Sequence, residues 1–342
     1  MLKRSISCAV LGALTASTAL VQAQTIDSLQ RSAKVYADTD WAGTYLRLCI
    51  PTGGPLIIPT NNPANFPSAE LPDLPNGDPP AANWYAPPAK IGDNLYFLGE
   101  RAHNSFALVS KDREIILIDG LFDYATGPEI LEGLQALGLN PKKVRYALIA
   151  HEHGDHDGGA HLLQQAIPGM TLVYGEAAWP SVLARTGPHA TRSGPENDGT
   201  DGRVITVGDV SVQIVTMPGH TPGTISFLFT FTDNGKPIKV AYVGGTAISF
   251  NQNATYYNNY LASSRKFANA AAAYGATAIM SNHTEFDNGY FRSLTAAALT
   301  GKIGHDPDVP HPYFVGQRAV MNYMGVVELC TMAAKLRATG SL

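Results

Sequence analysis

Short runs of apolar residues recur between residues 94 and 281, and glycine, asparagine and aspartate separate many of them. Runs of about four to eight apolar or alternating residues between such turn signals are typical of β-strands. We therefore expect strands at residues 94–99, 105–110, 114–120, 144–150, 171–175, 212–217, 224–231, 239–245 and 277–281.

Other segments place apolar residues three to four positions apart, which is the spacing of one face of an α-helix. The helices predicted on this basis cover residues 26–49, 126–139, 161–167, 263–275 and 313–338. Strands and helices alternate through much of the chain, with several hairpins among the strands. This order predicts two sheets packed face to face with helices outside them, an α/β sandwich.

Residues 51–88 have a different composition, because 11 of these 38 residues are proline. Proline removes backbone donors and interrupts regular structure, so we expect an extended strap laid across the surface. The predicted organisation is a leader at residues 1–23, an N-terminal helix and proline-rich strap at 24–89, and a core domain at 90–342 that ends in a long helix.

The composition suits a globular protein with a large core, because 45% of the 342 residues are hydrophobic and 15% are charged. The formal net charge is −4, and the chain contains no block of basic residues. Nucleic acids and anionic membrane surfaces are therefore not expected as partners. We expect a small-molecule substrate, no stable membrane insertion, and a monomer or small homo-oligomer.

The first 23 residues have the pattern of a secretory signal peptide. Lys3 and Arg4 precede a short apolar stretch and a small-residue cleavage pattern that ends at Ala23. We therefore expect export to the periplasm or the extracellular medium, with Cys49 and Cys330 as the cysteines of the mature chain. In an oxidising compartment such a pair is a candidate disulfide, and two buried thiols are the alternative.

Titratable residues are concentrated in the segment ALIAHEHGDHDGG at residues 147–159, directly after a predicted strand. His151, His153, Asp155 and His156 fall within six positions of each other. Alternate side chains of an extended loop point the same way, so the first two histidines can bind one ion while the other pair reaches a neighbouring point. Imidazole and carboxylate groups at this density favour zinc, and a polar loop without a ligand is the weaker alternative.

Two further histidines follow predicted strands in the same way. His220 lies in the turn MPGHTPG after residues 212–217, and His283 follows the strand at 277–281. Strand ends on one rim of a sheet bring together residues from distant parts of a chain. We therefore expect both histidines to complete a metal site with the first cluster, although a lone histidine is more often structural.

The HxHxDH segment, the glycine pair after it, the GHTPG turn and the final histidine together resemble the metallo-β-lactamase superfamily, over roughly residues 90–300. The resemblance implies a four-layer αββα sandwich that binds two zinc ions per chain in a groove at one edge. It also implies a ligand set for each ion, namely His151, His153 and His220 for the first and Asp155, His156 and His283 for the second.

The residues around these ligands resemble subclass B3 metallo-β-lactamases. His153 stands where iron-binding members of the superfamily have a carboxylate. Gly244 and Gly245 stand where lactonases, glyoxalase II enzymes and tRNA-processing nucleases usually have a bridging aspartate, and where some β-lactamases have a cysteine. B3 enzymes often have serines here that help to hold the carboxylate of the drug, and this chain has Gly245 and Ala247 instead. The sequence therefore does not identify the substrate.

The resemblance implies a secreted hydrolase in which two zinc ions activate a water molecule and Asp155 orients the hydroxide that forms. The expected reaction opens an amide bond, as in a β-lactam ring. Hydrolysis of a lactone, ester or thioester is the alternative. A third hypothesis is a metal-binding or redox protein without hydrolytic activity.

Several other polar residues lie near these motifs in the sequence. Asp119 ends a neighbouring strand and either anchors the metal loop or is an ordinary turn residue. Asp157 either supports the site or caps a helix, and Thr221 orients the loop next to His220. Structural or exposed positions are expected for the histidines without a motif: His103, His161, His189, His305 and His311.

Two polar segments are candidates for the rim of the site. Residues 186–202 are rich in glycine and proline, so we expect a loop there, and contact of its His189 with the substrate is the alternative to an exposed position. Residues 251–260 contain Tyr256 and Tyr257, which either line the groove or belong to an ordinary surface loop.

Overall fold

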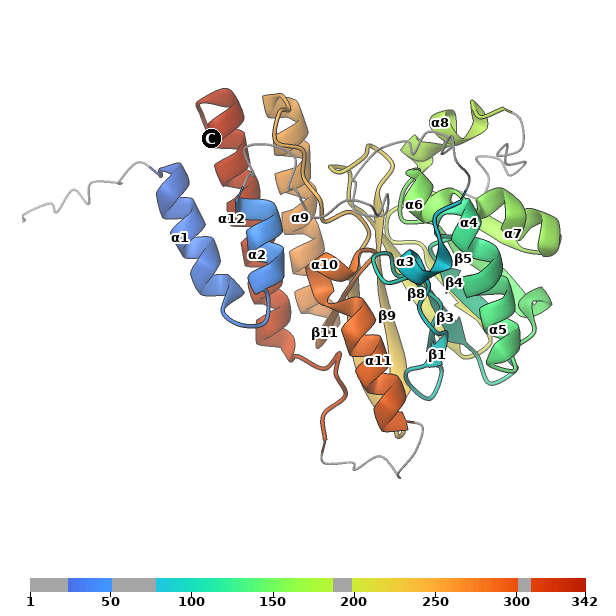
Figure 1. Cartoon of the computed structure of the whole chain (residues 1–342). Coiled ribbons are helices and arrows are strands. Elements are labelled where there is room, and N and C mark those ends of the chain that lie inside the picture. Colours follow the sequence, from blue (N-terminus) through green and yellow to red (C-terminus); the bar gives the residue numbers. More distant parts are fainter. Residues whose placement is uncertain (1–23, 51–77, 187–198, 301–308) are drawn as a thin grey trace, which may run out of the picture.

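The computed structural model describes residues 24–50, 78–186, 199–300 and 309–342, and two β-sheets form its centre (Figure 1). The first sheet has the strand order β1-β2-β3-β4-β5-β6, antiparallel as far as β4 and parallel from β4 to β6. Its strands are β1 (Ala89–Lys90), β2 (Leu95–Phe97), β3 (Phe106–Val109), β4 (Ile115–Ile118), β5 (Val144–Leu148) and β6 (Thr171–Val173).

The second sheet has the strand order β11-β10-β9-β8-β7, and only β10 and β11 are parallel to each other. The hairpin between β9 and β10 turns at Asn234 and Gly235, whose φ angles are 50° and 71°. An Asn-Gly pair tolerates these positive φ values, which explains the turn at this point. The strands are β7 (Val204–Val207), β8 (Val210–Thr216), β9 (Ile225–Asp233), β10 (Lys236–Val243) and β11 (Ala278–Ser281).

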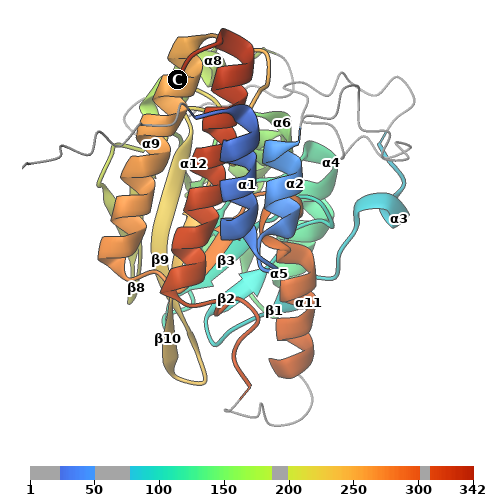
Figure 2. The same ribbon diagram turned by 90° about the vertical axis from the view of Figure 1, so that its left-hand side faces the viewer.

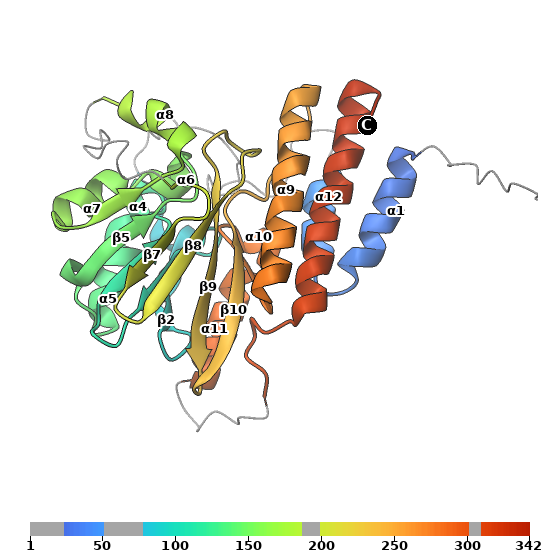
Figure 3. The same ribbon diagram turned by 180° about the vertical axis from the view of Figure 1, so that it is seen from behind.

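The two sheets pack face to face because alternate residues of each strand point to opposite sides. In β4, Ile116 and Ile118 face the core between the sheets, whereas Ile115 and Leu117 face the outer helices. The residues of β10 alternate in the same way. Both faces of each sheet are therefore buried, and the molecule has the four helix–sheet–sheet–helix layers that the sequence predicts (Figure 3).

Short helices cover the outer face of the first sheet (Figure 3). They are α4 (Asp123–Ala125), the π-helix η2 (Thr126–Leu131), α5 (Glu132–Ala136), α7 (Ala160–Ala166) and α8 (Trp179–Leu183). One regular helix over residues 126–139 was expected, but its first half has π geometry. The helix also ends early, because Gly138 adopts a φ of 71° just after it.

Longer helices cover the outer face of the second sheet. α9 (Ala254–Tyr274) and α12 (Gln317–Thr339) lie next to the sheet, and α1 (Ile26–Ala37) and α2 (Ala42–Cys49) pack on α12 (Figures 1 and 2). Trp41 joins this outer pair to α12, since its Nε1 donates a hydrogen bond to the carbonyl of Ala319 at 2.8 Å.

The N-terminal segment differs from the single helix expected over residues 26–49. It forms two helices with a turn between them, and Asp38 at the end of α1 has a φ of 44° that a continuing helix does not allow. Cys49 at the end of α2 forms a disulfide with Cys330 of α12 across 281 positions of the sequence. The predicted disulfide is therefore present, and it fixes the N-terminal helices to the C-terminal helix.

Several other elements differ from the predictions. α9 begins at Ala254 rather than near residue 263, because the side chain of Asn253 caps it by accepting a hydrogen bond from the backbone N–H of Tyr256. α3 (Ala81–Trp84) interrupts the segment predicted as an extended strap. β7, α10 (Thr284–Asp287) and α11 (Gly289–Thr300) have no counterpart among the predicted elements.

The leader at residues 1–23 and residues 51–77 of the strap lie outside the described residues, so both stay predictions, as does the division of the chain at residue 89. Among the helices that the structure describes, none is both long enough and apolar enough to cross a membrane.

Candidate metal centre

Three loops that follow strands meet at one edge of the sandwich. The loop after β5 carries the HxHxDH segment, the loop after β8 carries His220, and His283 follows β11. His153 directly precedes the short helix α6 (Gly154–Asp157), and His283 directly precedes α10. The fold therefore brings the six expected ligand residues into two neighbouring groups.

The first group consists of His151, His153 and His220, and one ring nitrogen from each lies within 4.8 Å of the other two. The Nε2 of His220 is 3.1 Å from the Nδ1 of His153. The Nε2 of His151 is buried and has no hydrogen-bond partner among the described residues. A buried polar atom without a partner is costly, and a cation between the three rings would satisfy it.

The second group consists of Asp155, His156 and His283. Asp155 Oδ2 lies 3.1 Å from His156 Nε2 and 3.3 Å from His283 Nε2, and the two nitrogens are 3.1 Å apart. In a tetrahedral zinc site with metal–ligand distances of about 2.0–2.1 Å, ligand atoms lie about 3.3 Å from one another. The spacing and the donor types of this group therefore fit a zinc ion.

Backbone carbonyl groups fix the orientation of two of the histidines. The Nδ1 of His151 is 2.9 Å from the carbonyl oxygen of Gly244, and the Nδ1 of His220 is 2.9 Å from that of Ala247. A carbonyl oxygen accepts only, so each Nδ1 carries the proton and each Nε2 presents its lone pair to the cluster. Asn282 holds the Gly244 carbonyl in place with its Nδ2 at 2.7 Å.

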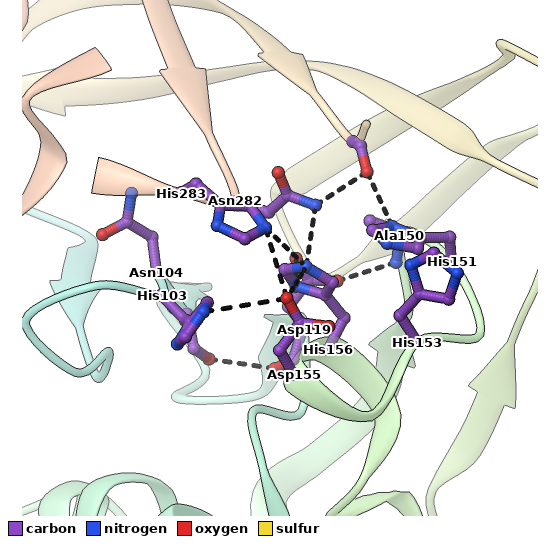
Figure 4. A network of polar contacts seen from close by, with 12 residues as sticks. His103, Asn104, Asp119, Ala150, His151, His153, Asp155, His156, Asn282 and His283 are labelled. Carbon is purple, nitrogen blue, oxygen red and sulfur yellow. Dashed lines mark hydrogen bonds and ion pairs between the residues drawn. The ribbon is translucent and has the colours of Figure 1, made fainter. Parts of the chain in front are cut away.

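Asp119 connects the end of β4 to the metal loop (Figure 4). Its Oδ1 accepts a hydrogen bond from the N–H of Ala150 at 2.7 Å, and its Oδ2 accepts one from the hydroxyl of Tyr242 at 2.7 Å. The same Oδ2 lies 3.4 Å from the Nδ1 of His156. A carboxylate behind the far nitrogen of a histidine orients the ring and increases the basicity of its other nitrogen.

A second set of contacts joins the metal loop to its surroundings on the side of Glu152. Arg185 forms an ion pair with Asp157 at 2.6 Å and donates a hydrogen bond to the carbonyl of Glu152 at 2.7 Å. Thr221 donates to the Glu152 carboxylate at 2.9 Å, so the side chain next to His220 reaches the first loop. Asp157 lies inside α6 and pairs with Arg185, so of the two alternatives for this residue the structure does not show the helix cap.

Burial keeps most of the histidines of the cluster in the neutral form that a metal requires. Burial, aided by the neighbouring imidazoles, holds the pKa of His151 well below its ordinary value and lowers the pKa of His220 to about 3. Burial also lowers the pKa values of His153 and His283, although Asp155 opposes the shift. These four rings therefore present unprotonated nitrogens at neutral pH.

Asp155 and His156 form a buried pair of opposite charge. Burial acts to raise the pKa of Asp155, but the charge and hydrogen bonds of His156 and His283 outweigh it and hold that pKa well below its ordinary value. Burial acts to lower the pKa of His156, but Asp155 and Asp119 outweigh it and raise the pKa to about 10. A metal cation in place of the proton on His156 would satisfy the same carboxylates.

Gly244 and Gly245 leave no room for a bridging carboxylate. A Cβ on Gly244 would lie 1.9 Å from the carbonyl oxygen of Ile225, and one on Gly245 would lie 2.8 Å from the Cβ of His220. Both distances are below any normal carbon contact. An aspartate at either position would therefore displace the backbone that orients His151 and His220.

His103 lies beside the second group, although its sequence context suggested only a structural position. Its Nε2 is 3.7 Å from Asp155 Oδ2, and the nitrogens of His103 and His283 lie within 4.8 Å of each other and of that oxygen. His103 is buried, which the expected structural position allows, but it lies next to the site rather than away from it. His161 and His311 have structural contacts instead, since their ring nitrogens lie within hydrogen-bond distance of the backbone carbonyls of Gly158 and Ile91.

The candidate rim residues are placed differently from the expectation. Tyr257 is completely buried in the core beside the second sheet, and its hydroxyl donates to the carbonyl of Ser249 at 2.8 Å. The Tyr256 hydroxyl accepts a hydrogen bond from the N–H of Ser249 at 3.0 Å. Tyr257 is therefore no groove residue, because its ring packs inside. His189 and His305 lie outside the described residues.

Comparisons with known proteins agree with this geometry. The family model described as the metallo-beta-lactamase superfamily matches residues 98–232. BJP-1, a subclass B3 metallo-β-lactamase of Bradyrhizobium japonicum, superimposes with a TM-score of 0.56 at 21% identity, over 71% of this chain and 91% of that one. The Rm3 metallo-β-lactamase superimposes with a TM-score of 0.56 at 25% identity, over 70% of this chain and 90% of that one.

The chain has the metallo-β-lactamase fold. The resemblance to the superfamily is therefore confirmed, and the resemblance to its subclass B3 is confirmed at the level of the fold. The sequence is also similar to human mitochondrial persulfide dioxygenase ETHE1, at 31% identity over 39% of this chain and 42% of the relative. A hydroxyacylglutathione hydrolase of Xanthomonas axonopodis pv. citri is 35% identical over 36% of this chain and 41% of the relative. The matched region spans about two fifths of the length of these curated relatives.

Proposed function

We propose that this protein is a zinc-dependent hydrolase that holds two metal ions. The observation that carries the proposal is the contact between two ligand groups, one of three histidines and one of Asp155, His156 and His283. Atoms of His151, Asp155 and His156 lie within 4.8 Å of one another, so the two groups adjoin. A pair of neighbouring ions of this kind is suited to hydrolysis of an acyl compound.

The residues of the chain divide the work between them. When bound, zinc lowers the pKa of a water molecule to about 7 and polarises a substrate carbonyl. His151, His153 and His220 form a three-histidine set, which is typical of catalytic rather than structural zinc sites. Asp155 is ionised beside them, so its carboxylate accepts a hydrogen bond from the attacking water and holds it in position.

The proposed substrate is an amide in a small ring, as in a β-lactam. Two observations support an amide: the B3-like ligand set and the absence of space for a bridging carboxylate at Gly244 and Gly245. A thioester, ester or lactone is the second candidate. It is supported by the similarity to the hydroxyacylglutathione hydrolase, whose match includes only part of either chain.

We also propose that the protein works outside the cytoplasm. The supporting observations are the leader-like residues 1–23 and the disulfide between Cys49 and Cys330. Disulfides such as this one between α2 and α12 form and persist mainly where the surroundings are oxidising.

The test is a metal analysis combined with a substrate panel, both on the full mature chain. We expect about two equivalents of zinc per chain and zinc-dependent hydrolysis of a penicillin or a carbapenem. The same panel includes a homoserine lactone and a glutathione thioester. Hydrolysis of the thioester alone would reassign the substrate, whereas a protein that binds no zinc and hydrolyses none of the four would overturn the proposed function.

A further inference from the structure

His103 reaches the metal centre from a part of the chain that carries none of the six expected ligands. It precedes β3 and forms an isolated antiparallel bridge with His283, so the backbones of the two residues are fixed next to each other. The two rings meet edge to face with their centroids 4.9 Å apart. His103 is completely buried, so the packing around it fixes the orientation of its ring.

One nitrogen of the His103 ring has a hydrogen-bond partner, and the other has none among the described residues. Its Nδ1 is 3.2 Å from the carboxylate of Glu100, which is also completely buried. Its Nε2 is buried without a hydrogen-bond partner among the described residues, 3.7 Å from Asp155 Oδ2 (Figure 4). A separation of 3.7 Å is too long for a hydrogen bond.

The arrangement calls for a cation between His103 and Asp155. The contact between Nδ1 and Glu100 leaves Nε2 as the ring atom that faces the Asp155 carboxylate oxygen. A buried polar atom without a hydrogen-bond partner is unfavourable, and a cation bound by Asp155, His283 and His103 would satisfy it. Three nitrogens then surround Asp155 Oδ2, those of His156, His283 and His103, at 3.1, 3.3 and 3.7 Å.

We propose that His103 is a further ligand of the second metal ion and that Glu100 is the carboxylate that orients it. The inference rests on the proposed metal centre and deepens it. The second ion is then held by four protein groups: Asp155, His156, His283 and His103. Four protein ligands are typical of closed zinc sites, whereas the three-histidine set of the first ion is typical of open ones.

The proposal gives the two ions separate tasks. The second ion would be bound permanently as part of the folded centre, and the first would keep a position for water and substrate. Glu100 contributes as a positioning residue, since a carboxylate on the far nitrogen of a histidine ligand fixes its tautomer. The Glu100 carboxylate is itself held by the hydroxyl of Tyr124, at 3.4 Å.

The experiment compares His103→Asn with His161→Asn, the same substitution at a buried histidine that contacts the Gly158 carbonyl. Asparagine can still donate to Glu100, but it is too short to reach the ion. Zinc affinity is measured by competition with a chromophoric chelator. We expect His103→Asn to weaken the binding of one ion at least 10-fold and to leave the other unchanged, whereas His161→Asn changes neither.

The number of histidine ligands can also be counted by NMR spectroscopy, which tests the role of His103 without an activity measurement. In the cobalt-substituted protein, each histidine ligand contributes one strongly shifted N–H proton signal. We expect one signal fewer in His103→Asn than in the wild type and in His161→Asn. Glu100→Gln keeps the shape of the side chain and is expected to weaken the same ion by about 10–100-fold without loss of a signal.

The outcomes separate this proposal from the proposed function. Equal signal counts and equal affinities in the wild type and His103→Asn would overturn the role of His103, even if both ions bind and the enzyme is active. A wild-type protein that binds no metal would overturn both proposals. If His103→Asn does not fold, the result for Glu100→Gln decides, and an unchanged affinity there counts against the proposal.

Discussion

The Nε2 atoms of His156 and His283 lie 3.1 Å apart although 127 positions separate these residues in the chain. Asp155 Oδ2 lies within 3.3 Å of both nitrogens, so three polar atoms from three side chains lie close together. A metal cation can bind all three atoms at once, in place of the proton that His156 otherwise holds between the carboxylates. The arrangement therefore predicts a strong dependence of the folded centre on metal.

Removal of metal is expected to lower both activity and stability. Ligands that bind only the folded state stabilise it by mass action, by about 4 kcal/mol at a free concentration 1,000 times the dissociation constant. We expect a chelator to abolish hydrolysis and to lower the Tm by several degrees, and added zinc to restore both. An unchanged Tm together with full activity after complete zinc removal would contradict this prediction.

His153→Ala is expected to remove one ligand of the three-histidine group. Its Nδ1 is 3.1 Å from the Nε2 of His220. Alanine at position 153 has no nitrogen that could bind the metal there. We expect zinc content to fall by about one equivalent and hydrolysis to fall at least 100-fold, measured by elemental analysis and initial rates. His161→Asn serves as the control and should keep both values.

Asp119→Asn is expected to weaken metal binding without removal of a ligand. The substitution takes the negative charge away from the Nδ1 of His156, which lies 3.4 Å from Asp119 Oδ2. We expect zinc affinity to fall by about 10–100-fold in a chelator competition assay. Tyr242→Phe removes only one hydrogen bond to the same carboxylate and should have a much smaller effect, so equal losses in the two variants would argue against an electrostatic cause.

Glu129→Gln is expected to stabilise the protein at alkaline pH. Burial raises the pKa of Glu129 to about 9, with a smaller contribution from the nearby Glu100 charge, although its Oε1 accepts a hydrogen bond from the N–H of Ala86. The unfolded chain releases this proton near the ordinary carboxyl pKa, whereas the folded chain keeps it. The wild type therefore loses stability as the pH rises from about 5 to 9.

Glutamine at position 129 keeps the acceptor oxygen and cannot ionise, so the variant should lack this loss. We expect the stability difference between variant and wild type to be small at pH 5 and to reach about 2–4 kcal/mol at pH 8, measured by denaturant unfolding. A difference that stays the same at both pH values would show that the pKa of Glu129 is not raised.

Loss of the disulfide is expected to destabilise the chain without a change in chemistry. The bond between Cys49 and Cys330 closes a loop across 281 positions, and closure of long loops stabilises by about 2–5 kcal/mol. We expect a Cys49→Ala/Cys330→Ala double variant to show a lower Tm and an unchanged zinc content. A reductant should lower the Tm of the wild type and leave that of the variant as it is.

The sequence reveals most of the metal centre because its residues occupy recognisable contexts. His151, His220 and His283 each follow an apolar run that forms a strand, so their convergence at one edge follows from the order of elements. His103 lies in no motif, and its approach depends on a backbone bridge to His283 that no local pattern encodes. Arg185 was missed for the same reason, because its ion pair with Asp157 is a tertiary contact.

The fold could be predicted at the level of layers and less well in detail. Short apolar runs such as Ile115–Ile118 identify the strands from the sequence. The π geometry of Thr126–Leu131 leaves the apolar spacing almost unchanged, so the sequence pattern does not reveal it. The first turns of α9 were missed because the segment NQNATYYNNY is rich in asparagine, although Tyr257 within it belongs to the core.

The disulfide also has a consequence for the order in which the protein matures. Ribosomes make Cys330 long after Cys49, so the N-terminal cysteine must wait for almost the whole chain to emerge. Oxidation of this pair can therefore take place only once the last helix has been synthesised. Until then Cys49 lacks its native partner, and the N-terminal helices are held to the rest of the fold by packing alone.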